Sequence, residues 1–347
     1  MQKTGSQILI DALKKENVEY IFGLPGGVII PLFDTLFDHS DIKFILTRHE
    51  QAAGHAADGY ARATGKVGVC IVTSGPGATN LTTAIATAYM DSIPMVAITG
   101  QVKTHLIGSD AFQEADVTGI TRPISKHNYL VKDIKELGRV VKEAFYIAST
   151  GRPGPVVIDL PVDVTTDTWD GDTPEKINLP GYKPSYEGNI RQIKIAAEAI
   201  NKSKRPVIYA GGGVISSNSS KQLIELAEKA NLPVNTTLLA LGVFPEDNEK
   251  ALGMLGMHGT VPANYAVHES DLLIAIGSRF DDRITGKIDE FASKARIIHI
   301  DIDPTSISKN IKVDIPVVGD AKNILTELIK HVNHVERKEW FEKIAEW

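Results

Sequence analysis

Cysteine is nearly absent from this sequence, which has 347 residues and a single cysteine, Cys70. One cysteine excludes an intrachain disulfide framework, so we expect a reducing, cytoplasmic setting. Cys70 lies in the apolar run VGVCIVTSG. We therefore interpret it as a small buried core residue rather than as a nucleophile.

Long apolar runs and runs of basic residues are also lacking. The longest apolar stretches, such as residues 93–98, are too short to span a bilayer. The first residues have neither the apolar core nor the cleavage site of a signal peptide. The net charge is −6, with no cluster of lysine and arginine. We therefore expect no membrane partner and no nucleic-acid partner.

The sequence does contain short apolar runs that alternate with helical patterns, which is typical of βαβ units around parallel sheets. Residues 166–188 interrupt this alternation, because they are rich in Asp, Thr, Pro and Gly and have no periodicity. We therefore predict an α/β protein with two doubly wound parallel-sheet domains, at 1–165 and 189–335, joined by a linker at 166–188.

Individual elements can be placed within these domains. A helix is predicted at residues 78–89, directly after the glycine-rich loop at 74–77. Strands are predicted in the first domain at 20–24, 43–47, 67–73, 95–99 and 156–159, and in the second at 207–210, 234–237, 272–276, 297–302 and 317–318.

Glu50 stands in RHEQAAGHAADGYARATG (48–65), where a charged triplet opens a helix made of small residues. A carboxylate at a helix start gains about 0.3–1 kcal/mol from the helix dipole, so an ordinary helix-start acid is one interpretation. The other is that small side chains allow a ligand or another chain to approach Glu50. A zinc-protease motif is excluded because Ala53 occupies the position of its second histidine. No metal ligand is predicted in this chain.

Two glycine-rich loops, PGG (25–27) and SGPGATN (74–80), each follow a predicted strand and precede a helix. Glycine permits tight turns there and lets a ligand approach backbone N–H groups. Such loops also occur as ordinary strand-to-helix turns. Because both follow strand ends of one sheet, we expect them to line a shared crevice.

Three stretches of the second domain could bind a nucleotide. GGGVIS (211–216) resembles a dinucleotide loop, but Ser216 replaces the third glycine and no acid ends the next strand, so the nicotinamide motif is weak. GSRFDDRITG (277–286) is either a salt-bridged surface loop or a loop that presents arginines to phosphates and aspartates to hydroxyls. MLGMHG (254–259) is either core packing or an apolar ledge against a flat ring.

Together with GLPGG, TGQV, AFQEADV and GRPGPVVIDLP, these motifs resemble the catalytic large subunit of acetohydroxyacid synthase, also called acetolactate synthase. The resemblance covers essentially the whole chain. RHEQAA and GPG are shared across the wider thiamine-diphosphate superfamily, whereas AFQEADV and RFDDR-x-TG are more specific to this member. The resemblance implies a thiamine-diphosphate domain followed by a Rossmann-like domain that binds FAD.

The resemblance also gives Glu50 a role. In this family the matching glutamate hydrogen-bonds a ring nitrogen of the aminopyrimidine and so promotes removal of the thiazolium C2 proton. Gly27 and Gln113 are the other expected catalytic residues, and Phe112 lies on the substrate side. The residues expected to bind thiamine diphosphate are Pro25, Gly26, Glu50, Pro76 and Asn80.

FAD, a structural cofactor in this family, is expected in the second domain. The residues expected to contact it are Arg152, Gly211, Gly212, Gly213, Leu239, Met257, His258, Gly277, Arg279, Asp281, Arg283, Asp301, Ile302, Asp320 and Ala321. One position departs from the family. Many relatives have a lysine in LP-K-DV, and this chain has Val162 there, so a role for that lysine does not carry over.

The family's GDG…NN motif, which binds Mg²⁺ and the diphosphate, is not found. We therefore expect this Mg²⁺ site on a further domain, residues 336–347 to begin the linker to it, and the chain alone to be inactive. The resemblance implies 2-keto acid substrates, a homodimer or tetramer, and a regulatory small subunit. The alternatives are a glyoxylate carboligase type of enzyme or a non-catalytic FAD- or nucleotide-binding module. RFDDR-x-TG argues against a flavin-free catabolic acetolactate synthase.

Overall fold

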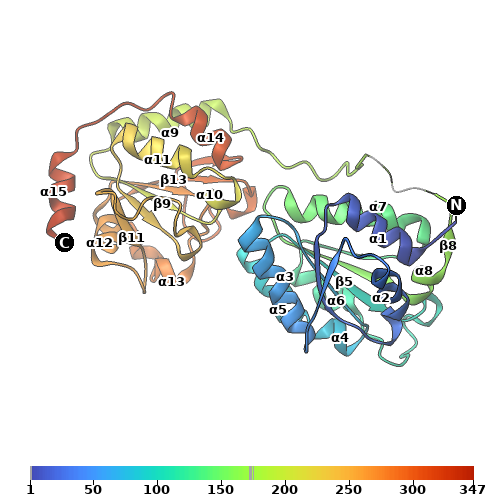
Figure 1. Cartoon of the computed structure of the whole chain (residues 1–347). Helices are drawn as coiled ribbons and strands as arrows, with labels where there is room; N and C mark the ends of the chain where they lie inside the picture. Colours follow the sequence, from blue (N-terminus) through green and yellow to red (C-terminus); the bar gives the residue numbers. More distant parts are fainter. Residues whose placement is uncertain (1, 172–173, 175) are drawn as a thin grey trace. The chain divides into compact units, whose positions relative to one another are not determined.

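The structure is a computed structural model that describes residues 2–171, 174 and 176–347. The chain divides into two compact units, Met1–Lys183 and Pro184–Trp347 (Figure 1). This division lies inside the segment 166–188 that the sequence analysis assigned to a linker. Each unit has its own sheet and its own cores.

In the described part of the first unit, six parallel strands form the main sheet in the order β3-β2-β4-β5-β7-β6. The strand order reverses at β2, since β3 lies on one side of it and β4 on the other. In doubly wound sheets the crevice at such a reversal is the usual ligand site. The strands are β2 (Tyr20–Leu24), β3 (Lys43–Leu46), β4 (Gly68–Val72), β5 (Met95–Gln101), β6 (His127–Leu130) and β7 (Pro155–Pro161).

Helices cover both faces of this sheet. Every residue of β4, β5 and β7 is buried, which explains why apolar residues predominate in these strands. Helices α1 and α7 contribute to one core, and α3 and α5, side by side in Figure 1, contribute to the other. The helices are α1 (Gly5–Lys15), α2 (Ile30–Phe37), α3 (Glu50–Thr64), α4 (Pro76–Thr79), α5 (Thr82–Asp91), α6 (Val117–Thr121), α7 (Ile134–Ser149) and α8 (Val162–Thr166).

Part of the segment 166–188 packs on the first unit. Strand β8 (Thr168–Trp169) pairs antiparallel with β1 (Lys3–Thr4). Leu179 and Tyr182 pack against the core that contains α1 and α7. The first unit therefore extends well past residue 165.

The second unit has the same architecture, with six described parallel strands in the order β11-β10-β9-β12-β13-β14. Its order reverses at β9, between β10 and β12. The strands are β9 (Pro206–Ala210), β10 (Val234–Thr236), β11 (Ala251–Met254), β12 (Leu272–Ile276), β13 (Arg296–Asp301) and β14 (Ile315–Val318). The helices are α9 (Ile190–Lys202), α10 (Gly213–Ser216), α11 (Ser220–Ala230), α12 (Val261–Glu269), α13 (Asp282–Thr285), α14 (Ala321–Leu328) and α15 (Lys338–Glu346).

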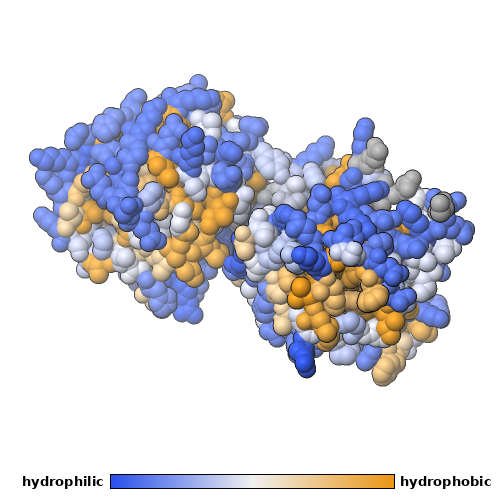
Figure 2. All heavy atoms as spheres, viewed as in Figure 1, coloured by the Kyte–Doolittle hydropathy of each residue, from blue (hydrophilic) through white to orange (hydrophobic). Residues whose placement is uncertain are grey.

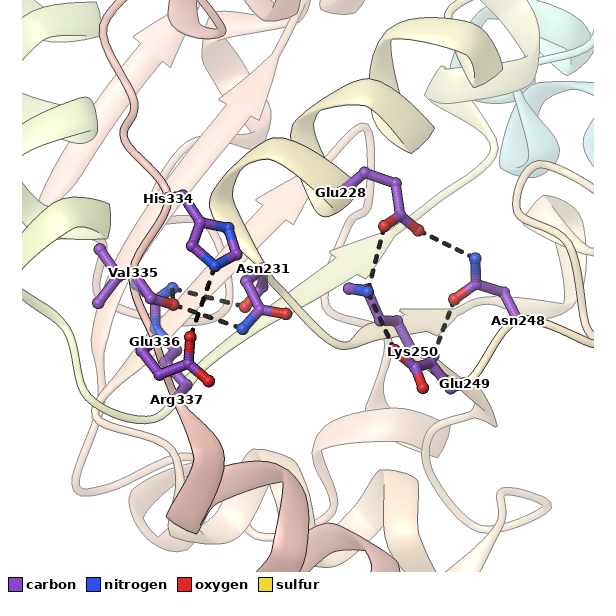
Figure 3. A network of polar contacts seen from close by, with 9 residues as sticks. All are labelled: Glu228, Asn231, Asn248, Glu249, Lys250, His334, Val335, Glu336 and Arg337. Carbon is purple, nitrogen blue, oxygen red and sulfur yellow. Dashed lines mark hydrogen bonds and ion pairs between the residues drawn. The ribbon is translucent and has the colours of Figure 1, made fainter.

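The end of the chain is part of this second unit. Trp340, in α15, is buried and donates from Nε1 to the Pro206 carbonyl at 3.1 Å. Arg337, just before α15, is 4% exposed and donates to the Ile200 and Ala230 carbonyls, at the C-terminal ends of α9 and α11. Figure 3 shows this guanidinium beside Val335 and Asn231, where the Asn231 amide donates to the Val335 carbonyl. Residues 336–347 were expected to begin a linker. In the structure they contribute side chains, such as Trp340, to a core of the second unit.

The predicted fold class, two doubly wound α/β domains, is confirmed. The predicted single helix at 78–89 is wrong: α4 ends at Thr79 and α5 begins at Thr82. Cys70 is buried in β4, and burial raises the pKa of its thiol to about 12, which agrees with a core role. No helix in the described part of the chain is both long and apolar enough to cross a membrane.

Candidate functional site

The candidate site residues of the first unit, apart from Arg152, lie at one edge of its sheet. Pro25, Gly26 and Gly27 follow β2, Glu50 follows β3, Pro76 and Asn80 follow β4, and Phe112 and Gln113 follow β5. These strands are parallel, so their carboxyl ends meet at the same edge. The structure therefore brings the predicted thiamine-diphosphate and substrate residues to the edge where the strand order reverses.

Glu50 is the first residue of α3. The N-cap of this helix is His49, whose Nδ1 accepts from the Gln51 N–H. The Glu50 side chain is buried, with 8% exposure. Asn80 donates from Nδ2 to Glu50 Oε2 at 2.9 Å. The break between α4 and α5 falls at Asn80 and Leu81, so Asn80 is not part of a continuous helix. The carboxylate is thus both buried and held in one orientation.

The two glycine loops pack closely at this point. A Cβ on Gly26 would lie 2.5 Å from the Thr73 Cβ, so only glycine fits between the loops after β2 and β4. A Cβ on Gly77 would lie 2.6 Å from the Thr73 Cγ2 and 3.3 Å from Glu50 Oε1. By contrast, a Cβ on Gly27 would meet no atom within 4 Å. The backbone at Gly27 therefore borders open space beside a closely packed base.

Two hydroxyl groups at this base lack partners within the described residues. Thr73 Oγ1 and Ser74 Oγ are buried and make no hydrogen bond there. Buried polar atoms are normally satisfied, so unsatisfied ones beside an open backbone are consistent with a polar ligand. An aminopyrimidine ring, with ring nitrogens and an exocyclic amine, suits this set of one carboxylate, two hydroxyls and glycine backbone. Sequence reasoning did not single out Thr73 or Ser74, because hydroxyl residues are common in such loops.

Phe112 and Gln113 lie on a loop between β5 and α6. Phe112 is 87% exposed, and Gln113 has a positive φ of 58°. A Cβ on Gly75 would lie 2.4 Å from the Gln113 carbonyl oxygen, so this loop contacts the loop after β4 directly. The Glu114 carboxylate accepts from the N–H groups of Gly108 and Ala111, and these bonds hold the pKa of Glu114 below its usual value.

In the second unit the predicted FAD residues also follow strand ends. The loops after β9 and β12 meet at the reversal of strand order, where Gly213 N–H donates to the Gly277 carbonyl at 3.0 Å. A Cβ on Gly211 would lie 2.2 Å from that carbonyl oxygen. Gly277 itself has φ +58°. Glycine at these positions is therefore required by backbone-to-backbone packing, whether or not a nucleotide binds.

The remaining predicted FAD residues of this unit lie along the same edge. Asp281 and Asp320 are N-caps, accepting from the N–H groups of Arg283 and Lys322. Met257 is exposed, and its N–H donates to the Arg283 carbonyl at 3.0 Å. The residues at or after the end of each strand are Gly211, Gly212 and Gly213 (β9), Leu239 (β10), Met257 and His258 (β11), Gly277, Arg279, Asp281 and Arg283 (β12), Asp301 and Ile302 (β13), and Asp320 and Ala321 (β14).

This edge, too, has unsatisfied buried polar atoms within the described residues, namely Thr237 Oγ1, Ser278 Oγ and His299 Nδ1. His299 is fully buried, and its Nε2 lies 2.8 Å from the Ser278 carbonyl oxygen. Sequence reasoning identified none of these three residues. A ligand with ring nitrogens, hydroxyls and phosphates, such as FAD, fits an edge that combines these atoms with exposed arginine and N-terminal helix ends.

Arg152 is the exception among the predicted FAD residues. It lies in the first unit, before β7, at the edge of the sheet opposite to Glu50. Its Nε donates to the Ser92 Oγ at 2.8 Å. Among the described residues, no group of three or more His, Cys, Asp or Glu side chains is arranged to hold a metal ion. Val162, at the position of the family lysine, begins α8.

Two family models match the chain. Residues 3–120 match the thiamine pyrophosphate enzyme N-terminal TPP binding domain, and residues 193–328 match the thiamine pyrophosphate enzyme central domain. The matched ranges contain the two edges described above. The chain belongs to the thiamine pyrophosphate enzymes.

Its relatives include named acetolactate synthases. The chain is 57% identical to a probable acetolactate synthase large subunit of Methanocaldococcus jannaschii, over 99% of this chain and 59% of the relative. It is 53% identical to an acetolactate synthase of Mycobacterium bovis, over 98% of this chain and 56% of the relative. The chain is 52% identical to the acetolactate synthase large subunit of Buchnera aphidicola, over 99% of this chain and 61% of the relative. The chain thus spans little more than half the length of these relatives.

Proposed function

We propose that the protein carrying this chain is an acetolactate synthase catalytic subunit. It would decarboxylate pyruvate and join the two-carbon unit to a second pyruvate or to 2-ketobutyrate, in valine, leucine and isoleucine biosynthesis. The observation that carries the proposal is the buried Glu50 carboxylate, oriented by Asn80 at the carboxyl edge of a sheet that matches a TPP binding domain. Three relatives at 52–57% identity bear that name and support it.

In this proposal Glu50 holds a proton at a ring nitrogen of the aminopyrimidine of thiamine diphosphate. Burial and the Asn80 hydrogen bond keep the carboxyl group in place for this transfer. Pro25, Gly26 and Pro76 shape the pocket, and Gly27 leaves room over the reacting centre. Bound thiamine diphosphate supplies the electron sink for decarboxylation that amino-acid side chains lack.

Phe112 and Gln113 face the substrate in the same proposal. Phe112 offers an exposed ring to the small 2-keto acid, and Gln113 offers an amide that can donate to its carbonyl or carboxylate oxygens. Both side chains stand on a loop that contacts Gly75, one residue before Pro76. The substrate residues and the proposed pyrimidine pocket therefore share one packed base.

The second unit would bind FAD along its carboxyl edge. Gly211, Gly213 and Gly277 would let the backbone approach the diphosphate, and Arg279 and Arg283 would pair with its charge. Asp301 and Asp320 would accept from ribose hydroxyls. Val162 supplies no charge where many relatives have lysine, so entry of the keto acid would not depend on a cation at this position.

Association with a second copy, as a homodimer or tetramer, belongs to the same proposal. Large apolar side chains are exposed on the first unit, among them Ile30, Phe37, Ile45 and Leu46. Figure 2 shows apolar surface, in orange, on this unit. Exposed apolar side chains of this number favour burial against another chain. The name "large subunit" carried by relatives supports a regulatory small subunit, and the lone buried Cys70 supports a cytoplasmic location.

The direct test measures acetolactate formed from pyruvate by the full-length protein, with thiamine diphosphate, Mg²⁺ and FAD added. We expect acetolactate from pyruvate and acetohydroxybutyrate when 2-ketobutyrate is also present. Preferential condensation of glyoxylate would replace this proposal with the glyoxylate carboligase type. A separate measurement concerns the chain 1–347 itself, which should bind FAD and show flavin absorbance after removal of free flavin.

A further inference from the structure

Two buried polar residues of the first sheet, Gln101 and Asp159, have no role in the proposed site as described so far. Gln101 ends β5 and is 2% exposed, and Asp159 lies in β7 and is also 2% exposed. Polar side chains this deeply buried are normally fully hydrogen-bonded, and such networks hold neighbouring backbone in one arrangement. The partners of these two side chains show which backbone that is.

Gln101 connects the sheet to the loop that carries Phe112 and Gln113. Its Nε2 group donates to Asp159 Oδ2 at 2.9 Å and to the Ala115 carbonyl oxygen at 2.9 Å. Its Oε1 accepts from the Val102 N–H at 2.8 Å, so the amide cannot rotate without losing all three bonds. Asp159 is held in turn by Thr99, whose Oγ1 donates to Oδ1 at 2.7 Å.

The loop itself has few other attachments to the sheet. Within it, Glu114 accepts from Gly108 and Ala111, and at its end Asp116 caps α6 by accepting from the Gly119 N–H at 2.8 Å. These bonds shape the loop without fixing its position. Its position comes from the Gly75–Gln113 contact on one side, from the Gln101–Ala115 hydrogen bond on the other, and from Val117 at its end, which is buried in the core that contains α3 and α5.

We propose that Gln101 and Asp159 are positioning residues, which hold the 108–117 loop at the distance from Glu50 that the reaction requires. Asp159 fixes the Gln101 amide, Gln101 fixes the Ala115 carbonyl, and the loop then presents Phe112 and Gln113 to the substrate. Neither side chain touches substrate or cofactor. The inference rests on the proposed function for the role of the loop, but the attachment itself is independent of it.

The first test measures amide hydrogen exchange in the chain 1–347. Gln101→Met removes both donors at nearly constant length, and we expect exchange at the Gly108, Ala111, Glu114 and Val117 amides to become at least about tenfold faster. Asp159→Leu should act in the same direction. Asp159→Asn keeps an oxygen that can accept from Gln101, so it should restore protection close to that of the wild type.

Thr99→Val is the matched control. It removes a buried hydrogen bond to the same carboxylate but none to the loop, so loop exchange should stay within about twofold of the wild type. General unfolding would instead raise exchange throughout β5 and β7. Unchanged loop exchange in Gln101→Met, or equal acceleration over the whole first unit, would overturn the positioning role.

The second test uses the full-length enzyme. Gln101→Met should raise KM for pyruvate and lower kcat/KM by about tenfold or more, because a displaced loop misplaces the substrate. Proton exchange at C2 of thiamine diphosphate should remain within about twofold, since Glu50 and Asn80 are untouched. Loss of both properties together would contradict the proposal.

The two ideas fail separately. If the wild-type enzyme makes no acetolactate but Gln101→Met still frees the loop, the proposed function is wrong and the attachment stands. If acetolactate forms normally in the wild type and Gln101→Met changes neither loop exchange nor KM, the proposed function stands and the positioning role is wrong.

Discussion

The Asn80 side chain donates from Nδ2 to the Glu50 Oε2 at 2.9 Å, across the space between α4 and α3. Asn80 is the C-cap of α4 and keeps right-handed helical backbone angles, φ −65° and ψ −17°, while its side chain reaches Glu50. A buried carboxylate held by a single amide retains its second oxygen for a ligand. That oxygen, Oε1, lies beside Gly77, where a side chain would be crowded.

Glu50→Gln should lower the rate of C2 proton exchange in thiamine diphosphate by at least about 100-fold in the full-length enzyme. Glutamine keeps the shape and can still accept from Asn80, but it cannot take up a proton. Exchange is measured by proton NMR after transfer of the holoenzyme into deuterated water.

Asp58→Asn is a suitable control for this measurement, because it neutralises another buried carboxylate of α3, one that pairs with Arg62 at 3.0 Å. We expect normal C2 exchange and a small loss of stability. Near-normal exchange in Glu50→Gln would remove the assigned role.

The small residues of α3 provide a second prediction, through Gly54 and Gly59. A Cβ on Gly54 would lie 2.5 Å from the Ala84 Cβ in α5, so Gly54→Ala should destabilise the first unit by roughly 1–3 kcal/mol. A Cβ on Gly59 would meet nothing within 4 Å, so Gly59→Ala should stabilise it by about 0.5–1 kcal/mol. Urea unfolding of the two variants checks this; equal effects would mean that α3 and α5 do not pack this closely.

The alternation of apolar runs and helices was enough to predict the fold. Strands such as β4 (GVCIV) are buried on both faces, and a parallel strand of this kind has a continuous apolar sequence. The points at which the strand order reverses, at β2 and β9, are harder to predict from the sequence, since strand order depends on pairing between distant segments. The sequence predicted that the loops at 25–27 and 74–80 would share a crevice, but not that the loops after β9 and β12 would touch at Gly213 and Gly277.

Within the site, residue type identified some residues, and only burial in the structure identified the others. Glu50 could be selected because a charged triplet opens a helix made mostly of small residues, and because this motif resembles the thiamine-diphosphate family. Gln101 and Asp159 could not, since a polar residue at a strand end is normally solvated, and only the structure shows that both are 2% exposed. The small residues of α3 suggested close approach by a ligand or another chain. In the structure, α5 is one of the elements that approach, at Gly54.

Arg337 provides a prediction for the second unit. It is a buried cation that donates to backbone carbonyls at the C-terminal ends of α9 and α11. The negative end of each helix dipole stabilises its positive charge there. Burial lowers the pKa of Arg337 to about 10. Arg337→Met should destabilise this unit by about 3 kcal/mol, because several carbonyls lose their donor. Arg337→Lys should not restore it fully, since an ammonium lacks the planar fork.

Fluorescence of Trp340, which is buried in the second unit, follows the unfolding of this unit in these variants when Trp169 is replaced by Phe in each protein. The exposed Arg191, at the start of α9, is the matched control, and Arg191→Met should stay within about 0.5 kcal/mol of the wild type. A similarly small effect for Arg337→Met would show that water can replace the guanidinium as hydrogen-bond donor without loss of stability.

The last prediction concerns pH and Asp159. Burial raises the pKa of Asp159 from 3.8 to about 7, with a further contribution from Asp116, against the hydrogen bonds from Thr99 and Gln101. Between these two pH values the folded state keeps a proton that the unfolded state has lost. The contribution of Asp159 to the free energy of unfolding should therefore fall as the pH rises from about 4 to about 7, and should be level outside this window. The shift of about 3 pH units corresponds to about 4 kcal/mol.

Asp159→Asn removes this titration, so the difference in unfolding free energy between the variant and the wild type should grow in favour of the variant over the same window. The difference is the informative quantity, because carboxylates with lowered pKa values, such as Glu114, act in the opposite direction in both proteins. Trp169 packs against the core of the first unit and can report its unfolding by fluorescence when Trp340 and Trp347 are replaced by Phe in both proteins. A constant difference between pH 4 and pH 8 would mean that Asp159 keeps an ordinary pKa, and that the Gln101 and Thr99 hydrogen bonds fully offset its burial.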